Sequence, residues 1–279
     1  MKELLSKDRA RTAISVIFAF ILSLCLFFVT LGGGCIYAVR SEFVLDSFAH
    51  SGYAEAATEE LTGQLNDLAI PSGLPDDFFS GRFKAEDIKK QMLTCCENIL
   101  EGRENAPDTA AVQADILNWV TTYSTDTAGE LSTATKSDLA LFSQECASTY
   151  LRFINHPTFN MVLPLFAAVM KYALIAVIAS IILATVCLVL IIRMNSAHAT
   201  RMYCFAAALG GALTCGVIPC ILIYRDELSK IGITSPSLHA LVTGFGYDFL
   251  PVLIWAAGIT ASVGIFILAF QIKDLIFKR

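Results

Sequence analysis

The chain has 279 residues, of which 55% are hydrophobic and 16% are charged, and its formal net charge is −5. A typical soluble domain is about 45–50% apolar and about 25% charged. This composition therefore excludes an ordinary soluble protein and favours an integral membrane protein.

Four long apolar runs account for the excess of hydrophobic residues. They predict transmembrane helices over 12–40, 161–192, 202–224 and 249–272. Each run is longer than the ~20 residues that a helix needs to cross a hydrocarbon core of ~30 Å. The segments that remain are a short N-terminus (1–11), an inserted domain (41–160), two loops (193–201 and 225–248) and a C-terminal tail (273–279).

Positive charges gather in the short segments on one side of these runs. The N-terminus, the loop 193–201 and the tail together carry nine Lys and Arg residues against three Asp and Glu residues. Because Lys and Arg are enriched in short cytoplasmic segments, the sequence predicts a multi-pass protein of the plasma membrane with both termini in the cytoplasm.

The inserted domain 41–160 is then extracytoplasmic, and it is strongly acidic. It holds seven Lys and Arg residues and nineteen Asp and Glu residues, a net charge of −12. Such a surface argues against nucleic acid as a partner, because the phosphate backbone is bound by basic surfaces. We expect membrane lipids around the spans and a protein partner on this domain.

The end of the first apolar run allows two interpretations. A basic start followed by "LGGGC" (31–35) resembles a cleaved signal peptide or a lipoprotein processing site, but the apolar run continues to Val39. A retained transmembrane helix is the favoured interpretation. Small residues let membrane helices approach closely, and oligomers can form through the same faces. The residues predicted to serve such helix packing are Gly32, Gly33, Gly34, Gly211 and Gly216.

Within the inserted domain, apolar residues recur at helical spacing. The first helix is predicted to continue out of the membrane as far as Leu68 and to stop at the Pro- and Gly-rich segment 70–83. Further helices are predicted over 85–102, after Pro107 and over 136–154, with a Thr- and Ser-rich loop at 121–135. No segment alternates with a period of two, so the fold class predicted for the chain is all-α.

The stretch "SGYAEAATEELTGQLNDLAIPSGLPDDFFSGRF" (51–83) resembles the start of the outer domain in a group of uncharacterised four-span membrane proteins of Gram-positive bacteria. The resemblance covers about a third of the inserted domain in detail and the rest only in layout. It implies a bacterial plasma membrane and an extracytoplasmic helical domain, and it implies no activity, because none is established for that group.

The nine cysteines divide between the spans and the inserted domain. Six lie in the spans, where Cys usually behaves as a small apolar residue. Cys95 and Cys146 lie on predicted apolar stripes that face a common core, and an oxidising exterior permits a disulfide bond between them. The alternatives are that Cys96 takes the place of Cys95, or that all three are reduced, buried thiols.

Two charged residues stand at the outer ends of the spans. Lys171 precedes the apolar part of the second span and Asp248 precedes the fourth, at matching depth. One hypothesis is an interfacial ion pair that holds these helix ends together and acts as a gate. The alternative is that each side chain reaches the interface independently of the other.

No catalytic or metal-binding motif occurs in the sequence. The four histidines are scattered, and the zinc-helix, serine-hydrolase and phosphate-binding motifs are missing. We therefore expect no enzyme activity, cofactor or metal. The leading hypothesis is a scaffold, sensor or interaction protein that presents the acidic helical domain. The alternative is a membrane subunit or accessory of a transporter, because one span, an outer domain and three spans resemble the layout of FtsX- and MacB-type subunits.

Overall fold

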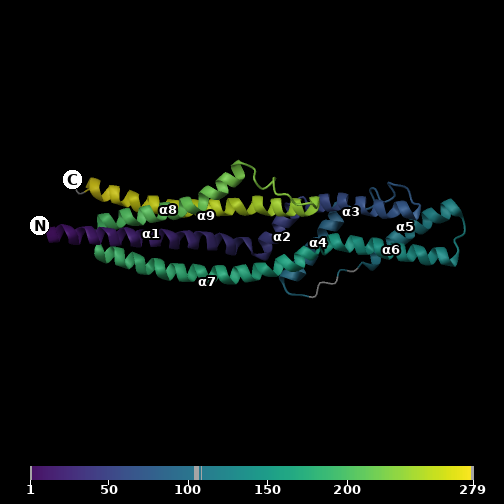
Figure 1. The fold of residues 1–279 in the computed structure, drawn as a ribbon, viewed down its shortest axis with the longest axis horizontal. Coiled ribbons are helices and arrows are strands. Elements are labelled where there is room, and N and C mark those ends of the chain that lie inside the picture. Colours follow the sequence, from purple (N-terminus) through teal and green to yellow (C-terminus); the bar gives the residue numbers. More distant parts are fainter. Residues whose placement is uncertain (1, 104–106, 108, 278–279) are drawn as a thin grey trace. The chain divides into compact units, whose positions relative to one another are not determined.

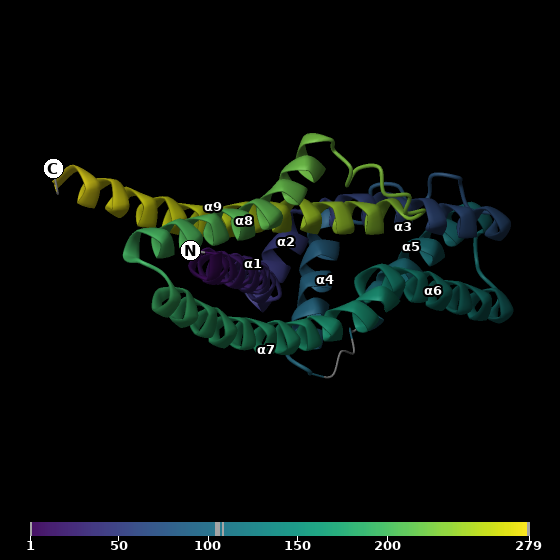
Figure 2. The same ribbon diagram turned by 60° about the vertical axis from the view of Figure 1, so that its left-hand side comes forward.

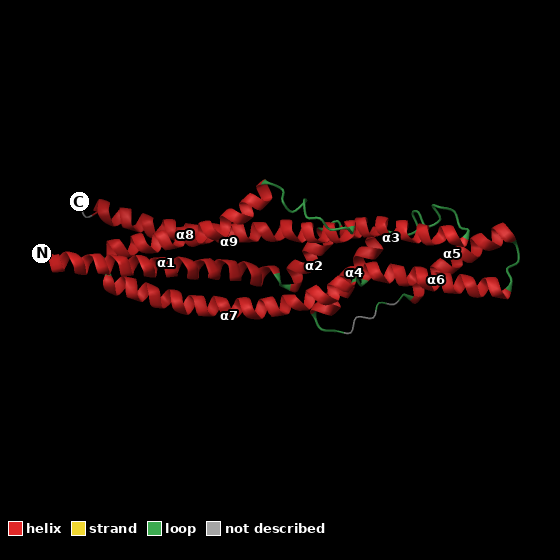
Figure 3. Ribbon diagram, viewed as in Figure 1, coloured by secondary structure: helices red, strands yellow, loops and turns green. Residues whose placement is uncertain are grey.

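The computed structural model describes residues 2–103, 107 and 109–277, with side chains described between 10 and 270 of those ranges. In this described part of the chain every regular element is a helix, as the all-α prediction requires (Figures 1 and 3). The elements in chain order are α1 (Lys2–Ala38), α2 (Ser41–His50), α3 (Tyr53–Ala69), the 3-10 helix η1 (Ile70–Ser72), α4 (Ala85–Leu100), α5 (Ala110–Ala128), α6 (Thr133–Ile154), α7 (Pro157–Met194), α8 (Ala197–Tyr224) and α9 (Pro236–Phe277).

The chain forms two compact units, each assembled from separate segments. The first, here called the apolar unit, consists of Met1–Phe43, Ala168–Ile231 and Gly246–Arg279. The second, here called the polar unit, consists of Val44–Ala167 and Gly232–Phe245. The predicted inserted domain makes up most of the polar unit, which also takes in the first residues of α9.

The apolar unit is built from α1, α8 and parts of α7 and α9, which run side by side in both views (Figures 1 and 2). The described part of the chain has four helices long and apolar enough to cross a membrane, as predicted. Large apolar side chains cover their outer faces, among them Ile182, Trp255 and Phe266, which are 61%, 75% and 64% exposed. Apolar surface of this extent suits contact with lipid rather than water, which indicates a multi-pass membrane protein.

Small residues bring the helices of the apolar unit close together. A Cβ atom on Gly211 of α8 would lie 3.0 Å from the carbonyl oxygen of Ser23 in α1, and one on Gly216 would lie 3.1 Å from the Cβ of Ala257 in α9. On α1, a Cβ on Gly32 would lie 2.5 Å from the Cγ2 of Val177 in α7. These three positions therefore have no room for a larger side chain.

The neighbouring glycines of α1 differ in their surroundings. A Cβ on Gly34 would lie 2.6 Å from the Cδ2 of Leu253 in α9, whereas one on Gly33 would meet no atom within 4 Å. One turn earlier, the hydroxyls of Thr30 and Thr260 are hydrogen-bonded at 2.8 Å and join α1 to α9. Gly33 thus lies on the open side of a helix that is packed on its other faces, and α1 runs through all three glycines without a break.

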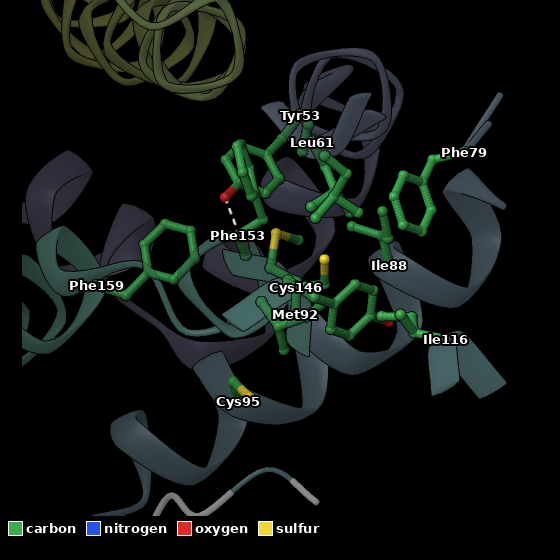
Figure 4. Close-up of a cluster of buried hydrophobic side chains, with 14 of the residues drawn as sticks. Tyr53, Leu61, Phe79, Ile88, Met92, Cys95, Ile116, Cys146, Phe153 and Phe159 are labelled. Carbon is green, nitrogen blue, oxygen red and sulfur yellow. Dashed lines mark hydrogen bonds between the residues drawn. The ribbon is translucent and has the colours of Figure 1, made fainter. Parts of the chain in front are cut away.

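The polar unit has its own core, formed by α2 to α7 and the start of α9 (Figure 4). Its centre is Tyr53, which is fully buried and whose hydroxyl donates a hydrogen bond of 2.7 Å to the carbonyl oxygen of Phe153 in α6. That carbonyl needs such a donor, because its partner in a continuing helix would be the N–H of Pro157, which proline lacks. Other fully or almost fully buried members of this core are Leu61, Leu65, Phe79, Ile88, Met92, Ile116 and Phe159.

Several predicted boundaries are wrong. The first helix does not continue to Leu68: α1 ends at Ala38, and Gly52 separates α2 from α3 with a φ of 76° that favours glycine. The predicted loop 121–135 is helical as far as Ala128, because Ile116, Val120 and Tyr123 keep one face of α5 on the core.

Two further helix ends lie inside segments predicted as loops. The loop 193–201 reduces to Asn195 and Ser196, since α7 ends at Met194 and Ser196 caps α8 by accepting a hydrogen bond from the N–H of Ala199. The loop 225–248 ends at residue 235, because α9 begins with Pro236, a favoured residue at the first position of a helix.

Candidate functional site

A hollow in the polar unit lies between α4 and α5. Both helices pack on α6 but hardly on one another, and the space between them is a cavity of about 770 Å³. We call it the α4–α5 groove and define it by Arg82, Lys84, Lys90, Asp115, Trp119 and Tyr150. Binding pockets for small molecules commonly measure about 300–1,000 Å³, so the size of this groove suits one.

Three cations line the groove. Arg82 is held in place, because its Nε donates a hydrogen bond of 2.6 Å to the carbonyl oxygen of Phe78. Its guanidinium carbon lies 4.4 Å from the ring centroid of Phe78 and 5.1 Å from that of Trp119. The ammonium groups of Lys84 and Lys90 are exposed. Within the described ranges none of these three cations forms an ion pair.

Tyr150 lies at the inner end of the groove. Its side chain is 3% exposed, its ring centroid is 5.7 Å from that of Phe83, and its hydroxyl makes no hydrogen bond to any described residue. Burial, with smaller contributions from Asp87 and Cys95, raises the pKa of this hydroxyl to about 12, so it is a neutral donor. The hydroxyl oxygen is not fully enclosed, and the residue lines the cavity, so water or a ligand can satisfy this hydroxyl.

Sequence reasoning placed Tyr150 on an apolar stripe and did not find the groove. The signal was the tripeptide Arg82–Phe83–Lys84, which puts two cations and an aromatic ring together in an otherwise acidic domain. Its meaning depends on the distance between α4 and α5, which the sequence does not supply.

A second polar cluster holds the start of α9 in the polar unit. The Glu60 carboxylate of α3 accepts hydrogen bonds from the hydroxyls of Ser235, at 3.0 Å, and Ser237, at 2.9 Å, and a longer one from the N–H of Ser237, at 3.4 Å. We call these three residues the Glu60 cluster. Ser237 is 1% exposed, and a carboxylate at a helix N-terminus is stabilised by the helix dipole. The cluster therefore fixes the first turn of α9 to α3.

The Glu60 cluster does not have the arrangement of a serine hydrolase site. Its serine hydroxyls donate to a carboxylate, whereas a nucleophilic serine requires a neighbouring base that can take its proton. Burial lowers the pKa of His156, and the smaller opposing effect of the Glu60 carboxylate does not cancel this shift. Its Nδ1 already accepts a hydrogen bond of 3.2 Å from the N–H of Thr158. The cluster is thus built to hold a helix in place.

The predicted disulfide bond between Cys95 and Cys146 is not formed in the structure. All nine cysteines are described, and no two are joined. Cys95 and Cys146 are both buried in the core of the polar unit, but Cys95 also lines the groove, and Figure 4 shows the two side chains apart. Burial raises the pKa of Cys146 and of Cys96 to about 12 each, so both are unreactive thiols at neutral pH.

The hypothesis of an ion pair between Lys171 and Asp248 receives no support from the structure. Both residues are described, both are exposed, and no ion pair joins them. Metal ligands are equally scattered, since the described residues include no group of three or more His, Cys, Asp or Glu side chains that could hold an ion.

Comparison with known proteins gives no relative from which a role could be transferred. No family model matches the chain, and no curated protein and no solved structure is significantly similar to it. The resemblance of residues 51–83 to a Gram-positive membrane-protein group is thus without support from these comparisons. What can be stated is a helical protein with four helices suited to span a membrane.

Proposed function

We propose that this chain is a non-enzymatic membrane protein that presents its polar unit outside a bacterial plasma membrane, as a sensor or interaction domain. The excess of Lys and Arg in the termini and in residues 193–201, where α7 ends and α8 begins, supports this orientation. The groove gives the polar unit a place to receive a partner or ligand. The geometry of the Glu60 cluster, in turn, argues against catalysis there.

The Glu60 cluster is the observation that carries the proposal. It makes the first turn of α9 part of the polar core, and the same unbroken helix continues into the apolar unit. Phe245, further along α9, adds ring contacts to Phe48 and Phe166, with centroid distances of 6.3 and 5.7 Å. A binding event that alters the polar core therefore has a covalent route to a membrane helix, as a sensor requires.

In-cell labelling tests the proposal. Glu97, which is exposed on α4, is replaced by Cys, and intact cells are treated with a membrane-impermeant thiol reagent. We expect labelling without permeabilisation, and labelling only after permeabilisation would refute the extracytoplasmic placement. A photoreactive residue at Thr94, which lines the groove, should then give adducts that the same residue at Asp138, exposed on α6, does not give.

The transporter alternative has a separate signature in the same experiment. A nucleotide-hydrolysing subunit that co-purifies with the cross-linked protein would favour it over a sensor. The structure offers little support, because the two residues between α7 and α8 leave no helix on which such a subunit could dock. Identical adducts at Thr94 and Asp138 would count against a specific role for the groove.

A further inference from the structure

We propose that the α4–α5 groove binds a small organic monoanion. This ligand consists of a carboxylate attached to an apolar part, either an aromatic ring or an acyl chain. This inference rests on the proposed function, since it names the kind of ligand that the polar unit would receive. Charge, apolar lining and an unused hydroxyl support it independently.

The charge of the groove is opposite to that of the domain around it. Residues 41–160 have a net charge of −12, yet three of their seven cations, Arg82, Lys84 and Lys90, line this one cavity. Hydrogen bonds between a charged donor and a carboxylate are about twice as strong as neutral ones. Lysines without an ion-pair partner and a fixed guanidinium are thus suited to receive a negative group.

The charge of the described lining favours a ligand with one negative charge. Among the described residues that line the groove, Asp87 and Asp115 are the acidic ones, so these residues together carry one surplus positive charge. A phosphate monoester, with nearly two negative charges at neutral pH, would face repulsion from both carboxylates. The single negative charge of a carboxylate matches the one surplus positive charge of these lining residues.

The remaining lining supplies the apolar contact and one further hydrogen bond. Ile88, Val112 and Trp119 form apolar walls, and the Phe83 ring meets Trp119 edge-on at a centroid distance of 5.8 Å. Tyr150, whose side chain is largely buried, also lines the groove, and its hydroxyl makes no hydrogen bond to any described residue. A ligand with an anionic end at Arg82 and Lys84 and an apolar body against Trp119 would satisfy all of these groups.

Trp119 provides a direct measurement. The chain has two tryptophans, and Trp255 is 75% exposed on α9 in the apolar unit, so Trp255→Phe leaves Trp119 as the only fluorescent indole. The full-length variant in nanodiscs is titrated with 4-phenylbutyrate, with its neutral amide and with inorganic phosphate. We expect a saturable change in Trp119 emission with the carboxylate and at least tenfold weaker binding of the amide, because a charged hydrogen bond is lost.

Variants identify the residues responsible. Lys84→Gln and Tyr150→Phe should each weaken 4-phenylbutyrate binding several-fold, whereas Lys136→Gln, exposed on α6, should leave it unchanged. Circular dichroism and thermal unfolding establish that each variant is folded. Equal binding of acid and amide, tighter binding of phosphate, or no saturable signal in the folded protein would overturn the inference. If Thr94 still gives specific protein adducts in cells, the proposed function survives that result, and the groove is then a protein-binding surface.

Discussion

Replacing Tyr53 by Phe tests the central interaction of the polar core. The substitution keeps the ring and removes only the hydroxyl that donates to the Phe153 carbonyl at 2.7 Å. Both partners are buried, and Pro157 cannot supply the missing N–H, so the carbonyl is left without a donor. An orphaned buried acceptor costs about 1–3 kcal/mol, and we expect the free energy of unfolding of the polar unit to fall by about 2 kcal/mol.

Denaturant unfolding of the full-length protein in the Trp255→Phe background measures this change, because Trp119 packs on the polar core. With a slope of about 2 kcal/mol per molar urea, the midpoint should fall by about 1 M. Tyr123→Phe is the matched control. Its hydroxyl makes no hydrogen bond with any described residue, so the free energy of unfolding should stay within about 0.5 kcal/mol of the parent. Equal midpoints for Tyr53→Phe and Tyr123→Phe would refute the reasoning.

The same hydrogen bond predicts a dependence on alkaline pH. Burial raises the pKa of Tyr53 well above its usual value, with smaller contributions from Cys96 and Glu60. The unfolded state therefore loses this proton first, near pH ~10. The stabilising contribution is complete below that pH and is lost as the pH rises above it. The difference in stability between the parent and Tyr53→Phe should accordingly shrink above pH ~10.

Three other predictions concern packing, thiols and interfacial charge. Gly211→Leu should lower the thermal midpoint of the apolar unit followed through Trp255, because a Cβ there already lies 3.0 Å from the Ser23 carbonyl, whereas Gly33→Leu, in open space, should not. Mass spectrometry of the unfolded, unreduced protein should find Cys95, Cys96 and Cys146 all alkylated; a linked pair would instead restore the predicted disulfide bond. Lys171→Glu and Asp248→Lys should each be tolerated, because both side chains are exposed and unpaired with one another; a loss of folding that the double reversal rescues would contradict this.

The four helices able to span a membrane and the helical class followed from composition and period, because burial in lipid or in a helical core depends on patterns that the sequence displays directly. Helix ends were harder to predict. Apolar spacing continues from Val44 to Leu68, yet Gly52 interrupts the helix, since a single left-handed residue redirects the chain without altering the pattern. The start of α9 was missed for a related reason. The segment 235–237 resembles a loop until Glu60, far away in the sequence, is seen to accept hydrogen bonds from Ser235 and Ser237.

The groove could not have been predicted at all. Tyr150 repeats at the spacing of a core residue, and it is a core residue by its 3% exposure. The Tyr150 hydroxyl is available to a ligand only because α4 and α5 lie apart. The distance between two helices depends on the sizes of many side chains at once, so the sequence does not supply it.

The segmented make-up of the polar unit imposes an order on its biosynthesis. Residues 44–167 leave the ribosome first, but Phe48 and Phe166 obtain their contacts with Phe245, and Glu60 its serine donors, only after α8 has been translated as well. Until the segment 232–245 arrives, the nascent domain carries an uncovered aromatic surface and an unsatisfied carboxylate. Completion of this core therefore requires that α8, which lies between its two segments in the sequence, has already been translated.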